Sequence, residues 1–459
     1  MELKNYDKMY FVGIGGIGMS AIAYRFCKAR FSVAGYDKTP SPITDRLINS
    51  GIPVNFIDSV EYILPVYKKD KEKTIVIYTP AIPKDNSILR YFIDNGYTVV
   101  KRSEVLGMLT KEKQSIAVAG THGKTSISTM VAWIMNNTCE AFLGGLSINT
   151  GSNVIINPDA KCVIVEADEF DRSFLTLYPK TAVVTAIDAD HLDIYKDIDN
   201  LNYTFHLFIE QIVPQGNLIY KYGLNIDKNV NKHINYLTYS LDNSDADFYA
   251  SDIIIADGFY KFTWNHPKGK IKDIMLGVPG LYNLENAVAA IAAAWLADID
   301  ESSISEHIKQ YKGVKRRFEY QILSDKIIYI DDYAHHPEEI KACVNSVKHL
   351  FPDKTITGVF QPHLYSRTQD FADEFAASLE NCDKIILTDI YPAREEPIPG
   401  VDSNIIFNKI KNPDKLLCKY SDLTDRVSET DTDIIITMGA GDIDRLVDKI
   451  KNVLTEKYL

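Results

Sequence analysis

The chain has 459 residues, of which 46% are hydrophobic and 24% are charged, and its formal net charge is -12. A single hydrophobic core stops growing at roughly 250–300 residues, so this length predicts about three domains. The acidic balance argues against nonspecific binding to nucleic acid, so local basic groups must meet any anionic ligand. The basic groups that stand out are Lys101-Arg102, Lys124, Lys315-Arg316-Arg317, Arg367 and Arg394.

The hydrophobic residues are distributed as in a soluble globular protein. No apolar run approaches the roughly 18 residues of a membrane helix, and the N-terminus is a short polar lead-in to a strand rather than a signal peptide. We therefore expect a cytoplasmic protein without a membrane partner. The six cysteines contain no Cys-x-x-Cys pair, so they predict neither a zinc site nor a disulfide framework but buried, unpaired thiols.

The first hundred residues begin with a glycine fingerprint. A strand at 9–12 leads into Gly13-Ile14-Gly15-Gly16-Ile17-Gly18, and a helix at 19–29 and a strand at 32–36 follow, with Asp37 closing that strand. This spacing is typical of a dinucleotide-binding turn, in which the acidic residue meets a ribose hydroxyl. The same turn can hold any pyrophosphate, so a nicotinamide cofactor and a nucleotide-linked substrate such as a UDP-sugar both remain open. A later strand at 74–78 leads into Thr79, and this domain should end near Gly107.

A second glycine loop, Gly120-Thr121-His122-Gly123-Lys124-Thr125, follows a strand at 115–118 and opens a helix at 127–135. In such a loop the backbone N–H groups and the helix N-terminus face phosphates. Lys124 adds a positive charge near the β/γ oxygens, and the Thr125 hydroxyl is a ligand for magnesium. The loop is tighter than the strict Walker spacing, which wants glycine where this chain has Val118. We predict that it binds a nucleoside triphosphate.

Two acidic clusters follow later strands of the same unit. A strand at 162–165 runs into Glu166-Ala167-Asp168-Glu169, and a strand at 181–187 runs into Asp188-Ala189-Asp190-His191. In a parallel sheet both clusters lie at the edge that carries the phosphate loop. One carboxylate there would bind magnesium, while His191 would ligate a second cation or transfer a proton.

An Ala-rich helix at 287–297 is dense enough in apolar residues to be buried. The segment before it contains Asn283 and Asn286, either of which would contact a purine, although helix capping by Asn283 is the alternative.

The last third again alternates strands and helices, which predicts a second doubly wound domain. Strands at 327–330, 355–360, 384–388 and 433–438 surround helices at 338–350 and from Arg367 to Leu379. His335, His336, His363 and Arg367 fall just past strand ends, where binding residues gather. The chain is thus expected to be α/β in three domains: a Rossmann-like domain at 1–107, a central P-loop ATPase with a mainly parallel sheet at 108–314, and a Rossmann-like domain at 315–459.

Along its whole length the chain resembles the Mur ligase family. The motifs that carry this resemblance, in chain order, are Gly-Ile-Gly-Gly-Ile-Gly-Met-Ser from Gly13, Gly-Thr-His-Gly-Lys-Thr from Gly120, Glu-Ala-Asp-Glu from Glu166, Asp-His-Leu-Asp from Asp190, Arg-Arg-Phe-Glu from Arg316, Asp-Tyr-Ala-His-His-Pro from Asp332 and Gln-Pro-His from Gln361. The resemblance implies an ATP-dependent ligase of peptidoglycan synthesis that joins L-alanine to the lactyl carboxylate of UDP-N-acetylmuramate through an acyl phosphate. It further implies ATP and Mg²⁺ as cofactors and an assembly that is a monomer or homodimer.

The resemblance also assigns residues to each ligand. UDP-sugar contacts are expected at Gly15, Gly16, Ile17, Gly18, Asp37, Thr79 and Arg102. ATP contacts are expected at Gly120, Thr121, His122, Gly123, Lys124, Thr125, Ser126, Asn283, Asn286, Arg317 and Asp331. Thr125 and Glu166 would hold one magnesium ion and His191 a second, and Tyr333, His335, His363 and Arg367 would surround the amino acid.

Lys124, Glu166, His191, Arg317 and His335 are the expected catalytic residues, and either histidine would accept the proton of the attacking amine. Two positions depart from the family pattern. Leu364 replaces an expected basic residue, which leaves Arg367 to bind the alanine carboxylate, and Tyr282 stands where we expect histidine.

Three alternatives stay open. A recycling ligase that joins UDP-N-acetylmuramate to a ready-made peptide shares the fold, but the run that starts at Glu169 favours the alanine enzyme. An NAD-dependent oxidoreductase would leave Lys124 and Glu166 without a function. A nucleotide-controlled binding protein is disfavoured by the loops rich in His, Tyr and Arg.

Overall fold

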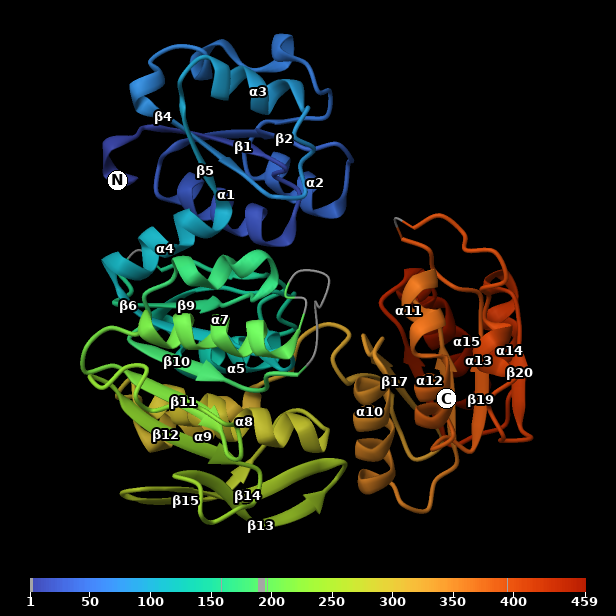
Figure 1. The fold of residues 1–459 in the computed structure, drawn as a ribbon. Coiled ribbons are helices and arrows are strands. Elements are labelled where there is room, and N and C mark those ends of the chain that lie inside the picture. Colours follow the sequence, from blue (N-terminus) through green and yellow to red (C-terminus); the bar gives the residue numbers. More distant parts are fainter. Residues whose placement is uncertain (1–2, 158, 189–194, 196, 394) are drawn as a thin grey trace. The chain divides into compact units, whose positions relative to one another are not determined.

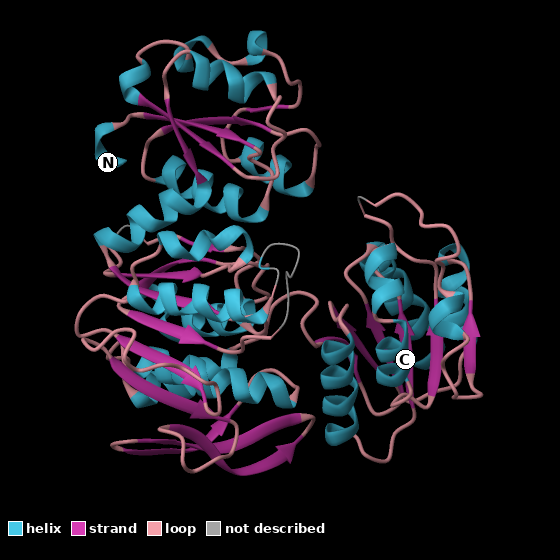
Figure 2. Ribbon diagram, viewed as in Figure 1, coloured by secondary structure: helices cyan, strands magenta, loops and turns pink. Residues whose placement is uncertain are grey.

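The chain folds into three sheets flanked by helices (Figures 1 and 2). The computed structural model describes residues 3–157, 159–188, 195, 197–393 and 395–459, and the side chains of residues 4, 170 and 171 are left out of that description. By its contacts the chain divides into two compact units. The first comprises Met1–Asp252, Phe262–Ile274 and Glu285–Lys312, and the second comprises Ile253–Lys261, Met275–Leu284 and Gly313–Leu459.

The N-terminal sheet has five parallel strands in the order β3-β2-β1-β4-β5, which is the Rossmann order without its sixth strand. Side chains alternate across it: Met9 and Phe11 pack in the core that includes Ile22 of α1, whereas Tyr10 and Val12 pack with Phe92 of α3. Figure 1 shows α3 on one face and α1 with α2 on the other. The strands are β1 (Lys8–Val12), β2 (Ser32–Tyr36), β3 (Val54–Asn55), β4 (Thr74–Tyr78) and β5 (Thr98–Lys101), and the helices are α1 (Ile17–Lys28), α2 (Pro42–Asn49), α3 (Ser87–Asp94) and α4 (Arg102–Glu112), with 3-10 turns η1 (Leu3–Asn5), η2 (Val60–Tyr62), η3 (Pro65–Tyr67) and η4 (Lys71–Lys73).

The second sheet has ten strands in the order β15-β14-β13-β12-β11-β10-β6-β9-β7-β8. Strand β6 lies between β10 and β9 and is parallel to both, so three carboxyl ends meet at one edge. The strands are β6 (Gln114–Ala119), β7 (Cys139–Phe142), β8 (Val154–Ile155), β9 (Cys162–Glu166), β10 (Thr181–Val184), β11 (Asn217–Lys221), β12 (Asn235–Ser240), β13 (Phe248–Ala256), β14 (Phe259–His266) and β15 (Gly269–Met275), and the helices and turns are α5 (Lys124–Met135), η5 (Asn136–Thr138), η6 (Phe170–Thr176), α7 (Ile198–Glu210), α8 (Leu281–Trp295) and α9 (Glu301–Gln310).

The third sheet has six strands in the order β16-β17-β21-β18-β19-β20, and only β16 runs antiparallel to its neighbour among the described pairings. Strand β21, the last in sequence, lies between β17 and β18. The strands are β16 (Glu319–Leu323), β17 (Ile328–Asp332), β18 (Ile356–Phe360), β19 (Lys384–Leu387), β20 (Lys415–Leu417) and β21 (Ile434–Met438), and the helices and turns are α10 (Pro337–Leu350), α11 (Tyr365–Asp370), α12 (Ala372–Leu379), α13 (Asn404–Phe407), η7 (Tyr420–Asp422), α14 (Leu423–Glu429), η8 (Asp442–Leu446) and α15 (Val447–Tyr458).

These sheets confirm the predicted α/β class with Rossmann-like end domains and a mainly parallel central sheet. The Ala-rich helix is buried as predicted, since residues 287–294 are all fully inaccessible. The exact domain boundaries, 107 and 314, stay predictions. In the described part of the chain no helix has the length and hydropathy of a membrane-spanning segment.

Several predicted element bounds were wrong. The helix expected from Ala287 already begins at Leu281, directly after Gly280 with its φ of +95°, so Asn283 lies inside the helix and does not cap it. The helix expected to run to Leu379 is broken at Phe371, whose ψ of 23° separates α11 from α12. The strand predicted at 181–187 ends at Val184. All six thiols are free, as expected, but only four are buried, whereas Cys27 and Cys418 are half-buried.

Candidate active site

The first glycine loop lies at the carboxyl edge of the N-terminal sheet. The register pairs Val12 with both Tyr36 and Tyr78, so the glycine loop, Asp37 and Thr79 follow three neighbouring strand ends. The N–H of Gly15 donates to Asp37 Oδ2 at 2.7 Å, and a Cβ at Gly15 would overlap that carboxylate. Asp37 therefore shapes the loop itself, through one carboxylate oxygen.

Arg102, the first residue of α4, lies against the start of α1. An added Cβ at Gly18 would lie 2.5 Å from Arg102 Nη1, so only glycine lets the guanidinium approach this closely. Helix α1 carries no acidic residue in its first turn, and within the described residues no side chain caps it. Its N–H groups and the guanidinium together form an environment that favours an anion.

The second glycine loop connects β6 to α5. Gly120 and Gly123 have φ values of +123° and +80°, which side chains rarely adopt, and an added Cβ on Gly120 would collide with Thr185. Thr185 donates its hydroxyl to the carbonyl of His122. Thr185, directly after β10, thus holds the loop in place, and α5 begins at Lys124 after its N-cap Gly123, with no acidic residue in its first turn.

Lys124 is engaged with Glu169. Its Nζ lies 2.8 and 2.9 Å from the two carboxylate oxygens of Glu169 and donates to the carbonyl of Gly120 at 2.7 Å. The Glu169 side chain is only 1% exposed and that of Lys124 is 14% exposed. The carbonyl of Glu169 also accepts from the buried Tyr195 hydroxyl and from the N–H of Arg172. Lys124 is consequently held by the carboxylate of a residue whose backbone carbonyl is itself hydrogen-bonded.

Thr125 and Glu166 come together beside this pair. The Thr125 hydroxyl donates to Glu166 Oε1 at 3.1 Å, and the N–H of Gly144 donates to Oε2 at 3.0 Å. A Cβ at Gly144 would overlap the carboxylate, so glycine lets Glu166 lie this close to the backbone. The hydroxyl and carboxylate oxygens are hard ligands of the kind that Mg²⁺ prefers.

The remaining loop residues lie close by. Thr121 donates to Asp188 Oδ2 at 3.3 Å, and His122 Nε2 lies 3.5 Å from the same oxygen. Asn286 Oδ1 lies where a side chain at Gly123 would be, so this asparagine lines the loop. Ser126 is buried in the first turn of α5.

Asn283 and Tyr282 are committed to neighbours within the second unit. Asn283 is buried and donates to the carbonyl of Pro279 at 2.7 Å. The Tyr282 hydroxyl donates to Asp332 Oδ2 at 2.9 Å, and the same oxygen accepts the N–H of Phe318 at 2.7 Å. Tyrosine in place of the expected histidine therefore serves as a partner for a buried carboxylate.

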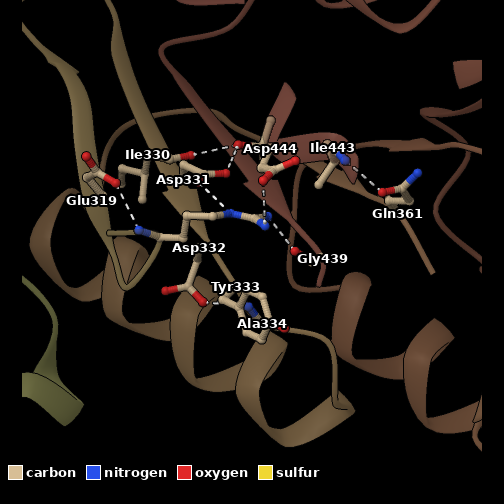
Figure 3. Close-up of polar contacts among 12 residues, drawn as sticks. Glu319, Ile330, Asp331, Asp332, Tyr333, Ala334, Gln361, Gly439, Ile443 and Asp444 are labelled. Atoms are coloured by element: carbon tan, nitrogen blue, oxygen red, sulfur yellow. Dashed lines mark hydrogen bonds and ion pairs between the residues drawn. The ribbon is translucent and has the colours of Figure 1, made fainter. Parts of the chain in front are cut away.

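Asp331 anchors a network at the carboxyl edge of the third sheet (Figure 3). Its Oδ2 accepts from Arg316 Nε at 3.1 Å and its Oδ1 from the Thr437 hydroxyl at 2.7 Å, while Arg316 Nη2 donates to the carbonyl of Gly439 at 2.5 Å. Burial raises the pKa of the Asp331 carboxyl to about 6, against the opposing effect of the guanidinium. The side chain is 1% exposed, and both of its oxygens are hydrogen-bonded to other side chains of the protein.

Arg317 points differently from its neighbour. Its guanidinium lies 5.2 Å from the ring centre of Tyr333, and that of Arg316 lies 5.3 Å from it. Arg317 Nη1 is 4.0 Å from Glu339 Oε1, and its side chain is 33% exposed, twice the 16% of Arg316. This exposure leaves Arg317 able to reach a ligand.

His335 follows two residues later, next to Glu339. Its Nδ1 lies 3.0 Å from the carbonyl of Tyr333 and 3.2 Å from Glu339 Oε2. The ring centre of His363 is 6.1 Å from that of His335. Three of the residues predicted to surround the amino acid, Tyr333, His335 and His363, are therefore neighbours.

Arg367 lies on the short helix α11. The helix start is fixed by Glu395, which accepts both the N–H and the hydroxyl of Ser366. His191, predicted to bind a second cation or to act as a base, lies outside the described residues.

The sequence interpretation missed Glu169, Gly144 and Glu339. Glu169 carried only the signal of an acidic cluster. Glu339 could have been found from the sequence. A glutamate at the third position of a helix that begins with proline is typical of an N-terminal capping box.

Comparison with known proteins covers the whole chain. Residues 8–114 match the Mur ligase family catalytic domain, residues 118–294 the Mur ligase middle domain, and residues 316–441 the glutamate ligase domain of Mur ligases. A UDP-N-acetylmuramate–L-alanine ligase of Porphyromonas gingivalis is 47% identical over 451 residues, which cover 97% of this chain and 99% of that protein.

Two solved structures share the fold. A UDP-N-acetylmuramate-alanine ligase of Thermotoga maritima superposes with a TM-score of 0.80 at 24% identity, covering 98% of this chain and 99% of the other. A murein peptide ligase of Psychrobacter arcticus gives 0.65 at 21% identity, covering 97% and 98%. Since the three domain matches and the near full-length identity agree, this chain belongs to the Mur ligase family.

Proposed function

We propose that this protein is the ATP-dependent ligase that joins L-alanine to the lactyl carboxylate of UDP-N-acetylmuramate in peptidoglycan synthesis. The observation that carries this function is the 47% identity, over nearly the full length of both chains, to a ligase named for those two substrates. The fold alone does not choose between substrates, because a murein peptide ligase shares it. The family assignment also removes the reason to read the first glycine loop as a nicotinamide site.

The N-terminal loop is proposed to hold the UDP moiety. The N–H groups at the start of α1 and the guanidinium of Arg102 supply positive charge for a diphosphate. Asp37 keeps Gly15 in position, and Thr79 follows the adjacent strand end. The expected contacts at Gly16 and Ile17 belong to the same turn.

The β6–α5 loop is proposed to hold the ATP phosphates. Gly120 and Gly123 allow the close turn, the N–H groups at the start of α5 face the phosphates, and Lys124 neutralises charge on them. For Lys124 to do so it must leave Glu169, its partner in this structure, or share its charge between the two.

Magnesium is proposed to bind at Thr125 and Glu166. The hydroxyl and carboxylate lie 3.1 Å apart beside the loop, and their oxygens fit the ion's preference. Among the described residues no group of three or more His, Cys, Asp or Glu is arranged as a metal cage. Two protein ligands suit Mg²⁺, which completes its shell with water and substrate phosphates. When bound, the ion would neutralise charge that develops on the phosphoryl oxygens.

The chemistry follows from the substrates. A carboxylate is a poor acyl donor, so a lactyl oxygen attacks the γ-phosphorus of ATP, the bond to the β-phosphate breaks, and ADP leaves. The resulting acyl phosphate is attacked at its carbonyl carbon by the alanine amine, and phosphate leaves. Lys124 and Arg317 are proposed to stabilise the transferring phosphoryl group, and Arg367 the alanine carboxylate.

Product analysis tests this function. The protein is incubated with ATP, Mg²⁺, UDP-N-acetylmuramate and, separately, alanine, glycine, serine or the stem tripeptide. We expect ADP, phosphate and the alanyl product, and preferential use of the tripeptide would contradict the proposal. Without alanine, added hydroxylamine should trap the acyl phosphate as a hydroxamate, whereas release of pyrophosphate would exclude this mechanism. Light scattering of the same sample tests the proposed monomer or homodimer.

A further inference from the structure

The ring of His335 faces two hydrogen-bond acceptors with one nitrogen. Nδ1 lies 3.0 Å from the carbonyl oxygen of Tyr333 and 3.2 Å from Oε2 of Glu339. A carbonyl cannot donate a proton, and an ionised carboxylate cannot either. Nδ1 must therefore carry the hydrogen, so the form of the ring that has lost one proton carries its lone pair on Nε2.

Glu339 is ionised and fixed in position. Burial alone would raise its pKa, but the side-chain hydrogen bond from His335, the positive charge of the His335 ring when protonated and the charge of Arg317 together hold the pKa of this carboxyl below its ordinary value. Its Oε2 accepts the backbone N–H groups of His335 at 3.0 Å and His336 at 3.2 Å. As third residue of α10, it also lies in the first helical turn, where a negative charge is favourable.

Two aromatic rings and one arginine lie near the His335 imidazole and Glu339. The rings of Tyr333 and His363 both meet the imidazole in T-shaped arrangements, with ring centres 5.1 and 6.1 Å away. Arg317 is 4.0 Å from the other oxygen of Glu339. Of these neighbours, Glu339 is the anion that meets the ring directly, so it is the group that stabilises an imidazolium.

We propose that Glu339 is a positioning residue that holds His335 with its Nε2 lone pair available, and that His335 is the base that deprotonates the amino group of the incoming amino acid. This inference rests on the proposed ligase function. It chooses between the two histidines that the sequence left open as bases.

The step balances as follows. Alanine enters as an ammonium ion, and Nε2 of His335 takes one of its protons, so that the neutral amine attacks the acyl carbon. The C–N bond forms, the C–O bond to the phosphate breaks, and the phosphate leaves with that electron pair. The second proton of the amine goes to the departing phosphate, and His335 later releases its proton to water. Glu339 offsets the positive charge of His335 in between.

The matched pair of variants is Glu339→Gln and Glu338→Gln. Both remove one carboxylate from the first turn of α10, but Glu338 is 72% exposed and lies 3.9 Å from Lys341. We expect E339Q to lower kcat for alanyl product by at least about 10-fold, while E338Q stays near wild type. Because the imidazolium loses its stabilising carboxylate, the acid limb of the kcat–pH profile should move to lower pH in E339Q only. Glu339→Asp, which keeps the charge, should recover part of the rate.

Trapping with hydroxylamine distinguishes an effect on deprotonation of the amine from an effect on formation of the acyl phosphate. It is largely uncharged at neutral pH and needs no base, so hydroxamate formation from ATP and UDP-N-acetylmuramate should be nearly the same in wild type, E339Q and H335Q. H335Q should lower alanyl transfer by about 100-fold or more. In the H335Q background, E339Q should add little, since Glu339 acts through that ring.

The outcomes are distinguishable. If wild type makes neither hydroxamate nor alanyl product, the proposed function fails. If wild type makes both, but E339Q and E338Q share one kcat–pH profile, or H335Q transfers alanine at the wild-type rate, the inference is overturned. An equal loss of hydroxamate and alanyl product in E339Q would assign Glu339 a purely structural role and overturn it as well.

Discussion

The phosphate loop and the edge of the third sheet both gather opposite charges, but they use them differently. Lys124 and Glu169 form an ion pair beside backbone N–H groups that face outward from a helix start, so a phosphate can replace or share the carboxylate. Arg316 and Asp331 form a pair that is about as buried as the first, at 16% and 1% exposure against 14% and 1%, but it is also joined to Thr437 of β21 and to the carbonyl of Gly439 just after that strand. We propose that the first pair opens to admit a phosphate, whereas the second holds the segment that carries Arg317 in place. The adjacent residues Arg316 and Arg317 would therefore have different roles, the first structural and the second in ligand binding.

The largest effect should come from Lys124→Ala. We expect a folded protein whose turnover is lower by a hundredfold or more, because one phosphate contact in such sites contributes on that order. Lys161→Ala, an exposed position, is the control. Steady-state kinetics and thermal unfolding check both variants. Wild-type turnover in folded K124A would show that Lys124 does not bind the transferring phosphate, and the proposed difference between the two ion pairs would then fail.

The two neighbouring arginines sharpen the comparison. Arg316→Ala leaves Asp331 buried without its cation and should cost about 3 kcal/mol or more in the free energy of unfolding. Arg317→Ala should cost less in the free energy of unfolding than Arg316→Ala yet lower turnover by about 100-fold. Denaturation monitored in the second unit, together with kinetics, gives both numbers. Equal destabilisation by the two changes would contradict the division of roles.

Arg367→Ala should raise the alanine requirement far more than the ATP requirement. The loss of one charge-assisted pair with a carboxylate costs about 2 to 4 kcal/mol, and Leu364 supplies no replacement charge. KM values for both substrates provide the measurement, and Arg426→Ala on α14 is the control. If both KM values rise alike, Arg367 maintains the structure of the site and does not bind the alanine carboxylate.

The smallest effect is a change in pH dependence. The pKa of Asp331 is raised from 3.8 to about 6 by burial, so its protonated form is favoured in the folded protein. This contribution to stability is fully present below about 3.8 and is lost as pH rises through about 6. Asp331→Asn should therefore weaken the decline in unfolding temperature as pH rises from 3.8 to about 6. A decline as steep as in wild type would mean that Asp331 does not titrate in this range.

Periodicity and local motifs were sufficient for much of the fold and part of the site. The strand, glycine loop and helix around Lys124 lie together in sequence, and the density of alanine at 287–294 predicts burial without knowledge of what covers it. The partners were not predictable in this way. Lys124 meets Glu169 across 45 residues and Arg316 meets Gly439 across 123, so those pairs depend on strand order.

Helix bounds failed for a local reason. Gly280 supplies the turn before α8, so Asn283 was not needed as a cap. At Phe371 neither glycine nor proline signals the break between α11 and α12.

The central position of β21 has a consequence for synthesis. The strand is formed by residues 434–438 of a 459-residue chain, yet it pairs with both β17 and β18. Domains fold as the ribosome delivers them, and the two parts of this sheet cannot join until residues 434–438 emerge. Until then β17 and β18 each lack the strand that will lie between them, and Arg316 lacks the Gly439 carbonyl that it will bind. A nascent chain that stalls near residue 430 would expose one unpaired edge on each of these strands, and unpaired strand edges are prone to aggregate.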